Sequence, residues 1–228
     1  GNRENGISIF NSTALKDIDI GDGSSVNGKV IIANNGGGIS ITGTGGIYGD
    51  EADIWIKAAT IGTDIGQDVN GSNTKDGPDE GTAPDGGGDG VLIDLSVGVA
   101  DVTIGTDANA SFDEEEKVFI ANNIHGINIG ERLNQVTIAG AIIGLLYNAG
   151  SGDFEDAGGN SGAGIFVESA YTNFSNLNIG GYLADERVIL SANNVGLDIV
   201  DAGPISGAAQ IDIQNSCFGT TDDCFTHS

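Results

Sequence analysis

The sequence of 228 residues has little of several residue types, and each shortage excludes a class of protein. It contains no Met and begins with Gly1, so we expect a processed mature chain or an excised segment. Only 3 Pro accompany 39 Gly, and the glycines follow no strict triplet, which excludes collagen. No apolar run approaches the roughly 18 residues of a membrane span, and the start does not resemble a signal peptide, so we expect no membrane insertion.

Positive charge is also scarce in this chain. It has 8 Lys and Arg against 33 Asp and Glu, which gives a formal net charge of -25. Such an acidic surface repels phosphates, so nucleic acid is not an expected partner, whereas divalent cations, calcium above all, are expected ones. Because 39% of the residues are hydrophobic, the chain can build a core, and we do not expect disorder along its whole length.

The two cysteines, Cys217 and Cys224, lie seven residues apart near the C-terminus. In a secreted chain they would close a small loop, and in a reducing cytosol they would be free thiols. The acidic, Lys-poor composition, rich in Gly, Asn, Asp and Thr, favours an extracellular or cell-surface location. A disulfide is therefore the preferred interpretation.

A short strand signal led by glycine recurs along the chain, and two other strand signals follow it in a fixed order. Together they make six strand signals, and the whole series occurs three times, over 5–64, 90–146 and 163–222. Because the first signal appears twice in each series, each repeat is expected to contain two coils of three strands. The six glycine-led signals are GISI (6–9), GISI (38–41), GVLI (90–93), GINI (126–129), GIFV (164–167) and GLDI (196–199).

Three short strands per turn, alternating apolar residues and Gly or Asn at the corners predict an all-β parallel β-helix of about six coils. We expect one domain over 1–228, with acidic insertions at 65–89 and 148–160 that fall at the same corner. A β-sandwich is the competing fold, but it would not need a threefold ordered repeat. No stretch has the sustained 3.6-residue period of a βαβ protein. The predicted inward residues include Ile7, Ile9, Ile18, Ile20, Ile39, Ile41, Ile54 and Ile56.

The segments GDGVLI (88–93), VTIGTD (102–107) and NSGAGIFV (160–167) resemble the right-handed β-helix repeats of large secreted bacterial and archaeal surface proteins. The resemblance implies a right-handed solenoid and an extracellular protein. It does not imply one activity, because such coils occur in adhesins, surface fibres and polysaccharide-active enzymes. The pairs Asn34/Asn35, Asn122/Asn123 and Asn193/Asn194 are similar to the asparagine ladders of that architecture, and they fall two coils apart.

The acidic insertion 65–89 is the best candidate for a metal site. Clustered carboxylates supply the oxygen ligands that calcium prefers, although the spacing matches no EF-hand. A solvated acidic edge that keeps the protein soluble explains the same residues. The candidate calcium ligands are Asp76, Asp79, Glu80, Asp85 and Asp89.

Trp55 is the second candidate for a contact site. It should point outward between Ile54 and Ile56, where it could stack on a sugar or a neighbouring subunit, or pack beneath the 65–89 insertion. The sequence contains no set of residues that we expect to be catalytic.

The open ends of a solenoid must be capped or joined to another chain. We therefore expect an extracellular structural or adhesive module, a filament or surface-layer building block with calcium-binding acidic edges. Its partners would be copies of itself, joined end to end or laterally, or the rest of a larger surface protein. The alternative is a module that binds or degrades polysaccharide.

Overall fold

The computed structural model describes the strands of the chain and part of its connections. The described residues are 2–11, 16–21, 30–32, 35–44, 52–62, 88–97, 100–105, 117–131, 133–148, 153–155, 159–168, 176–183, 186–200 and 210–219. These segments form 20 strands, and an all-β fold is thereby confirmed.

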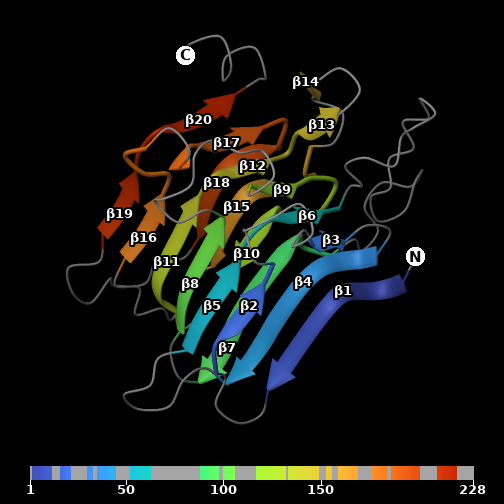
Figure 1. The fold of residues 1–228 in the computed structure, drawn as a ribbon, viewed down its shortest axis with the longest axis vertical. Helices are drawn as coiled ribbons and strands as arrows, with labels where there is room; N and C mark the ends of the chain where they lie inside the picture. Colours follow the sequence, from blue (N-terminus) through green and yellow to red (C-terminus); the bar gives the residue numbers. More distant parts are fainter. Residues whose placement is uncertain are drawn as a thin grey trace.

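Eighteen of the strands form three parallel sheets of six strands each (Figure 1). Sheet A contains β1 (Asn2–Asn11), β4 (Asn35–Thr44), β7 (Val91–Val97), β10 (Ile127–Ile129), β15 (Ala163–Glu168) and β18 (Val195–Val200). Sheet B contains β2 (Ile18–Ile20), β5 (Ala52–Ile56), β8 (Ala100–Gly105), β11 (Leu133–Ala139), β16 (Asn176–Ile179) and β19 (Gln210–Ile213). Sheet C contains β3 (Val30–Ile32), β6 (Ala59–Ile61), β9 (Val118–Ile120), β12 (Ala141–Ile143), β17 (Val188–Ser191) and β20 (Ser216–Gly219).

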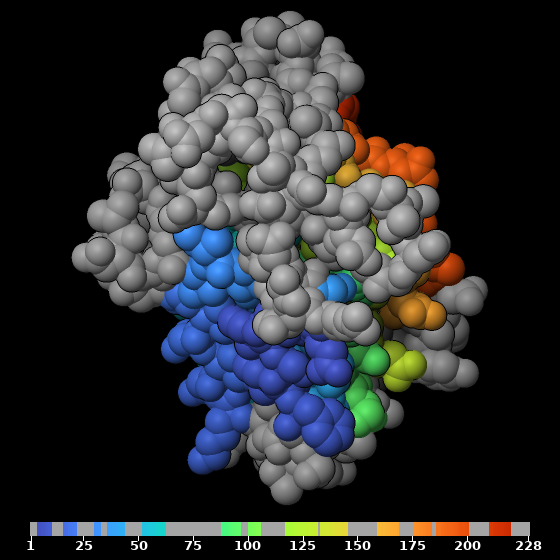
Figure 2. Space-filling view, turned by 90° about the vertical axis from the view of Figure 1, so that its right-hand side faces the viewer, coloured from blue at the N-terminus to red at the C-terminus, as the bar shows by residue number. Residues whose placement is uncertain are grey.

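The chain visits sheets A, B and C in turn, and each such turn is one rung of a solenoid. Six rungs follow, from β1–β3 to β18–β20, and each strand pairs in parallel with the equivalent strand of the next rung. The predicted solenoid of about six coils with three short strands each is therefore confirmed. The first and last rungs lie on opposite sides of the molecule (Figures 1 and 2).

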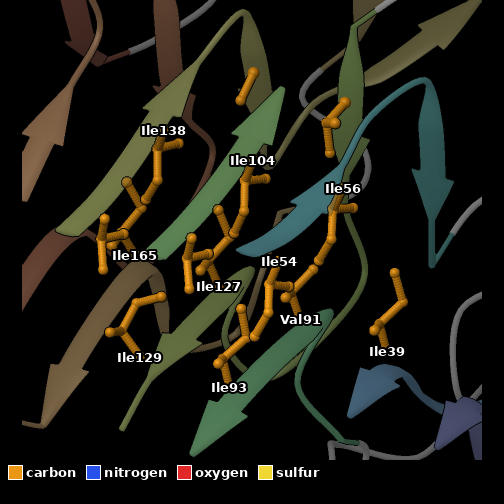
Figure 3. Close-up of a cluster of buried hydrophobic side chains, with 14 of the residues drawn as sticks. Ile39, Ile54, Ile56, Val91, Ile93, Ile104, Ile127, Ile129, Ile138 and Ile165 are labelled. Atoms are coloured by element: carbon orange, nitrogen blue, oxygen red, sulfur yellow. The ribbon is translucent and has the colours of Figure 1, made fainter. Parts of the chain in front are cut away.

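The core consists of columns of aliphatic side chains that run from rung to rung. In sheet A, Ile39 pairs with Val91, which pairs with Ile127, and all three are fully or almost fully buried. Sheet B supplies facing columns such as Ile56, Ile104 and Ile138 (Figure 3). Equivalent residues lie about 4.8 Å apart because that is the spacing of paired strands. The inward positions predicted from the alternating isoleucines are confirmed.

A column of glycines explains why four of the six sheet A strand signals begin with Gly. A Cβ on Gly126 would lie 2.5 Å from the carbonyl oxygen of Gly164 in the next rung, and closer still to Cγ2 of Ile143. Gly38, Gly90 and Gly164 are crowded in the same way. At this corner the backbones of successive rungs approach so closely that no side chain fits.

Both long insertions leave the solenoid at the corner between sheets C and A. The 65–89 insertion connects β6 to β7, and the 148–160 insertion lies between β12 and β15. The second one carries an antiparallel pair, β13 (Leu146–Asn148) with β14 (Asp153–Glu155). The prediction that the two insertions share a corner is confirmed.

The outer side of sheet C carries a second apolar cluster that the alternation did not predict. Phe119, Ile142 and Ile189 lie at the middle position of their strands, point away from the main core and are nearly inaccessible to solvent. Leu145 completes the cluster, and Cys217 packs against it. In β9, β12 and β17, sheet C is therefore apolar on both faces.

Candidate functional site

The predicted calcium site lies almost entirely outside the described residues, because Asp76, Asp79, Glu80 and Asp85 belong to the undescribed part of the insertion. Asp89 is described, directly before β7, and its Oδ2 accepts a hydrogen bond of 2.7 Å from Nδ2 of Asn128 in the next rung. Among the described residues, no cluster of three acidic, His or Cys side chains could hold a metal ion. The calcium site remains a prediction.

The described carboxylates at the corners serve to join neighbouring rungs. Oδ1 of Asp101, at the start of β8, accepts a 3.1 Å bond from the backbone amide of Gln135 and a 2.9 Å bond from Nδ2 of Asn134. Oδ1 of Asp94 accepts a 3.2 Å bond from the backbone amide of Glu131. Each of these bonds satisfies a donor of the following rung, so these acids have a structural role already.

An asparagine ladder runs through three successive rungs at the corner between sheets C and A. Oδ1 of Asn160 accepts a 3.0 Å bond from the amide of Asn123, and Nδ2 of Asn160 donates a 2.7 Å bond to Oδ1 of Asn193. Asn160, which is 2% exposed, lies in the coil between the predicted pairs Asn122/Asn123 and Asn193/Asn194, where no asparagine was predicted. These two predicted pairs are offset by one residue, because Asn123 aligns with Asn193 and not with Asn194.

His125 has a structural role at the same corner. Its Nδ1 accepts a 3.0 Å hydrogen bond from the backbone amide of Ala163, and its ring stacks on Phe166 with 4.6 Å between the centroids. The imidazole thus helps to connect the fourth rung to the fifth.

Trp55 lies on the outer face of sheet B, as predicted, between the buried Ile54 and Ile56. In its column it pairs with Asp19 on one side and Thr103 on the other. Nζ of Lys57 sits 3.7 Å from the centroid of the indole ring, which is a cation–π contact. The half-buried ring is thus partly covered by its own strand.

The predicted disulfide has one end in the described part of the chain. Cys217 lies in β20, half-buried, and its strand position pairs with Ile189. Cys224 lies outside the described residues, so the disulfide remains a prediction.

The two ends of the solenoid form the surface that differs most from the rest of the molecule. Nine large apolar side chains are exposed in the described part of the chain, and seven of them lie in the first or last rung. In the last rung Ile211, Ile213 and Phe218 are 49%, 44% and 44% exposed, although their partners one rung earlier are buried. The seven residues are Phe10, Ile31, Val195, Val200, Ile211, Ile213 and Phe218.

Ile211, Ile213 and Phe218 are exposed because of their place in the stack. Ile211 and Ile213 pair in register with Leu177 and Ile179, which belong to the core, so both isoleucines point inward. Among the described residues, no strand pairs with the outer edges of β18, β19 and β20, or with those of β1, β2 and β3. Within the described residues, the last rung therefore presents inward apolar side chains beside three unpaired strand edges, a combination that favours strand addition. In the first rung Ile20 and Ile32 are buried, and the exposed apolar side chains, Phe10 and Ile31, point outward.

The strands thus define a parallel β-solenoid. Comparison of the chain with protein-family models, curated proteins and solved structures gives no match. Within the described residues, no helix has the length and hydropathy of a membrane-spanning segment.

Proposed function

We propose that this chain is an extracellular structural or adhesive module that assembles through the ends of its solenoid, as a building block of a filament or surface layer. The observation that carries the proposal is the concentration of exposed apolar side chains in the two terminal rungs. Contiguous exposed apolar surface marks an interaction site. Parallel strand edges supply backbone donors and acceptors beside it.

Polar residues on the sides of the rod support the same proposal. The outer face of sheet B presents one column that contains Thr103, Thr137 and Asn178 and another that contains Asp101 and Gln135. Such a face favours solvation, and strong negative charge keeps lateral contacts between copies unfavourable. End-to-end contact is therefore preferred over lateral contact.

The test is to observe the native particle and the purified chain. Electron microscopy together with sedimentation velocity over a range of concentrations should show rods that grow in length and keep a constant width. A chain that stays monomeric at every concentration, and in both low and high salt, would contradict the proposal.

Calcium bound by the acidic insertion is part of this proposal. Asp89 and the preceding acids, among them Asp76, Asp79, Glu80 and Asp85, provide enough carboxylates for a site with oxygen ligands. Bound calcium would stabilise the folded chain by mass action, so chelation should lower the melting temperature. If the melting temperature is the same with and without chelator, calcium is not a ligand. The Cys217–Cys224 disulfide belongs to the extracellular proposal.

A polysaccharide-binding face is the second candidate, and the position of Trp55 favours it. The indole lies in an outer column with Thr103 and next to the Asp53 and Asp101 column, so an aromatic ring is surrounded by hydrogen-bonding groups. Sugars are recognised by such combinations. Titration of neutral and acidic glycans against the fluorescence of Trp55, the single Trp of the chain, tests this candidate. An unchanged spectrum with all of them would exclude it.

A further inference from the structure

We infer that the last rung of one copy binds the first rung of a second copy, in the register that continues the six inward columns of the core, two from each sheet. In this register Asp212 of one copy faces Asp19 of the other, and their repulsion weakens the joint at low salt. The inference rests on the proposed function and specifies its partner, its polarity and its regulation. It depends on four features of the two terminal rungs.

The first feature is the continuity of the inward columns. The column that begins with Ile7 in β1 ends with Leu197 in β18, and the column that begins with Ile20 in β2 ends with Ile213 in β19. A second copy placed one strand spacing beyond the last rung would set its Ile7 on Leu197 and its Ile20 on Ile213. Every inward position of the joint is then apolar except Ser216.

The second feature is the match of the outward apolar residues. Phe10 and Ile31, the exposed apolar side chains of the first rung, are 75% and 52% exposed. In the continued register Phe10 meets Val200, which is 38% exposed, and Ile31 meets Cys217. The outward apolar side chains of one end thus lie over apolar partners of the other end.

The third feature is the alternation of two kinds of rung. The sheet C segments of the first, third and fifth rungs read KVII (29–32), KVFI (117–120) and RVIL (187–190). Those of the other rungs read ATIG (59–62), AIIG (141–144) and SCFG (216–219). The six rungs end on the second kind, so a first rung placed beyond them continues the alternation. Two last rungs placed face to face would break this alternation, and the strands of the two copies would run in opposite directions.

The fourth feature is the glycine column. Gly38, Gly90, Gly126 and Gly164 each face the backbone of the next rung too closely for a side chain. At Gly196, in the last rung, the three nearest atoms all belong to the side chain of Phe218. Gly196 thus provides the same close approach for the backbone of an added rung.

One pair in the joint is unfavourable. In the outer column of sheet B, Asp19 and Asp212 stand at the two ends, and the uncharged Trp55, Thr103, Thr137 and Asn178 lie between them. Stacking two copies places Asp212 directly beside Asp19 of the second copy, and like charges opposite each other on paired strands are destabilising. Salt shortens the range of this repulsion, so the joint should tighten as salt increases.

Two complementary variants test the polarity of the joint. Ile213→Lys blocks the last rung, and the double variant Phe10→Lys with Ile31→Lys blocks the first rung. All three side chains are already exposed, so the substitutions should leave the fold intact, which circular dichroism and urea unfolding check. Each variant alone should be monomeric by sedimentation velocity, and an equimolar mixture should form a 1:1 species with twice the 23.0 kDa mass of one chain.

The outcomes separate this inference from the proposed function. If the wild-type chain assembles but the variant with a blocked first rung still dimerises alone, the last rungs bind each other and the inference is overturned, while the proposed function stands. If both blocked variants assemble as the wild type does, the ends are not the contact and both fail. A wild-type chain that never assembles also overturns both.

A matched pair of charge variants tests the role of the facing acids. Asp212→Asn should raise the association constant by up to about fivefold in ~0.05 M salt, and this gain should vanish in ~1 M salt. Asp198→Asn removes the same charge from the same rung, but Asp198 would face Ser8 of the second copy, so its effect should be smaller. Equal effects of the two variants would overturn the contact between Asp212 and Asp19.

Discussion

The glycine column makes a sharp prediction about two adjacent residues of β4. Gly38→Ala should destabilise the chain strongly, whereas Gly37→Ala should not. A Cβ on Gly38 would meet the carbonyl oxygen of Gly90 and Cγ2 of Ile61 well inside 3.0 Å, and the Gly90 carbonyl carbon at 3.0 Å. A Cβ on Gly37 would meet the end of the Asn5 side chain, which can turn away, and otherwise the Cα of Gly88 at an ordinary 3.4 Å.

The neighbours of Gly38 have little freedom to move. The Gly90 carbonyl accepts a 2.8 Å hydrogen bond from the amide of Ile39, and the Ile61 side chain is fully buried. Relief of the clash therefore requires a shift between two rungs, and overpacking of this kind costs about 1–3 kcal/mol. Both substitutions remove similar entropy from the unfolded chain, worth about 0.4–1 kcal/mol in favour of folding. Because this gain is similar in the two variants, we expect Gly38→Ala to be less stable than Gly37→Ala by the cost of the clash, about 1–3 kcal/mol.

Urea unfolding measures this difference. With a slope of about 2 kcal/mol per molar urea, this difference corresponds to a midpoint shift of about 0.5–1.5 M. Trp55 lies in the same rung as Gly38 and reports locally, and far-ultraviolet circular dichroism reports the whole solenoid. Coincident transitions from the two probes are required, because repeat proteins can unfold in parts. Equal midpoints for the two variants would refute the argument that backbone crowding selects glycine at this corner.

Three further changes test the ladder, a buried hydroxyl and the disulfide. Asn160→Ala should lower the free energy of unfolding by about 2 kcal/mol, because the buried amide of Asn123 and the half-buried Oδ1 of Asn193 lose their partner. Asn178→Ala on the outer face serves as its control in the same urea titration. Ser191→Ala should raise the melting temperature and add about 1 kcal/mol to the free energy of unfolding, because Oγ of Ser191 is buried without a hydrogen bond. Ala121 already fills the equivalent place two rungs earlier. A lower melting temperature would contradict this reasoning. Cys224→Ser should cost about 2 kcal/mol by opening a short loop, and identical melting curves with and without reductant would show that no disulfide forms.

The sequence predicted the inner core because its signal was simple. Isoleucines alternate with polar residues in ISI (7–9), IDI (18–20) and INI (127–129), and alternation fixes which side chains point inward. The same rule failed for sheet C, where VFI (118–120) and AII (141–143) are apolar at all three positions. A continuous apolar run indicates a strand that is buried on both faces. These runs could therefore have predicted the outer cluster.

The asparagine ladder and the end surface were harder to predict, for different reasons. Asn160 lies at the end of an insertion, so counting from the neighbouring repeats did not place it in a coil. Ile211 and Ile213 belong to a normal inward pattern, and their exposure arises only because they stand in the last rung. A periodic sequence therefore predicts which residues face the core, but the exposure of terminal residues depends on what lies beyond the last rung.

The crowded glycines also explain how the solenoid accommodates long acidic insertions. The 65–89 insertion returns to sheet A at Gly90, and the 148–160 insertion returns shortly before Gly164. A slip of one residue would place Ala163 or Ile165 where only glycine fits, and it would also turn the inward side chains of β15 toward solvent. The returning strand thus has one acceptable register whatever the length of the preceding insertion. Acidic segments can therefore accumulate at this corner without disturbing the columns on which the end-to-end joint depends.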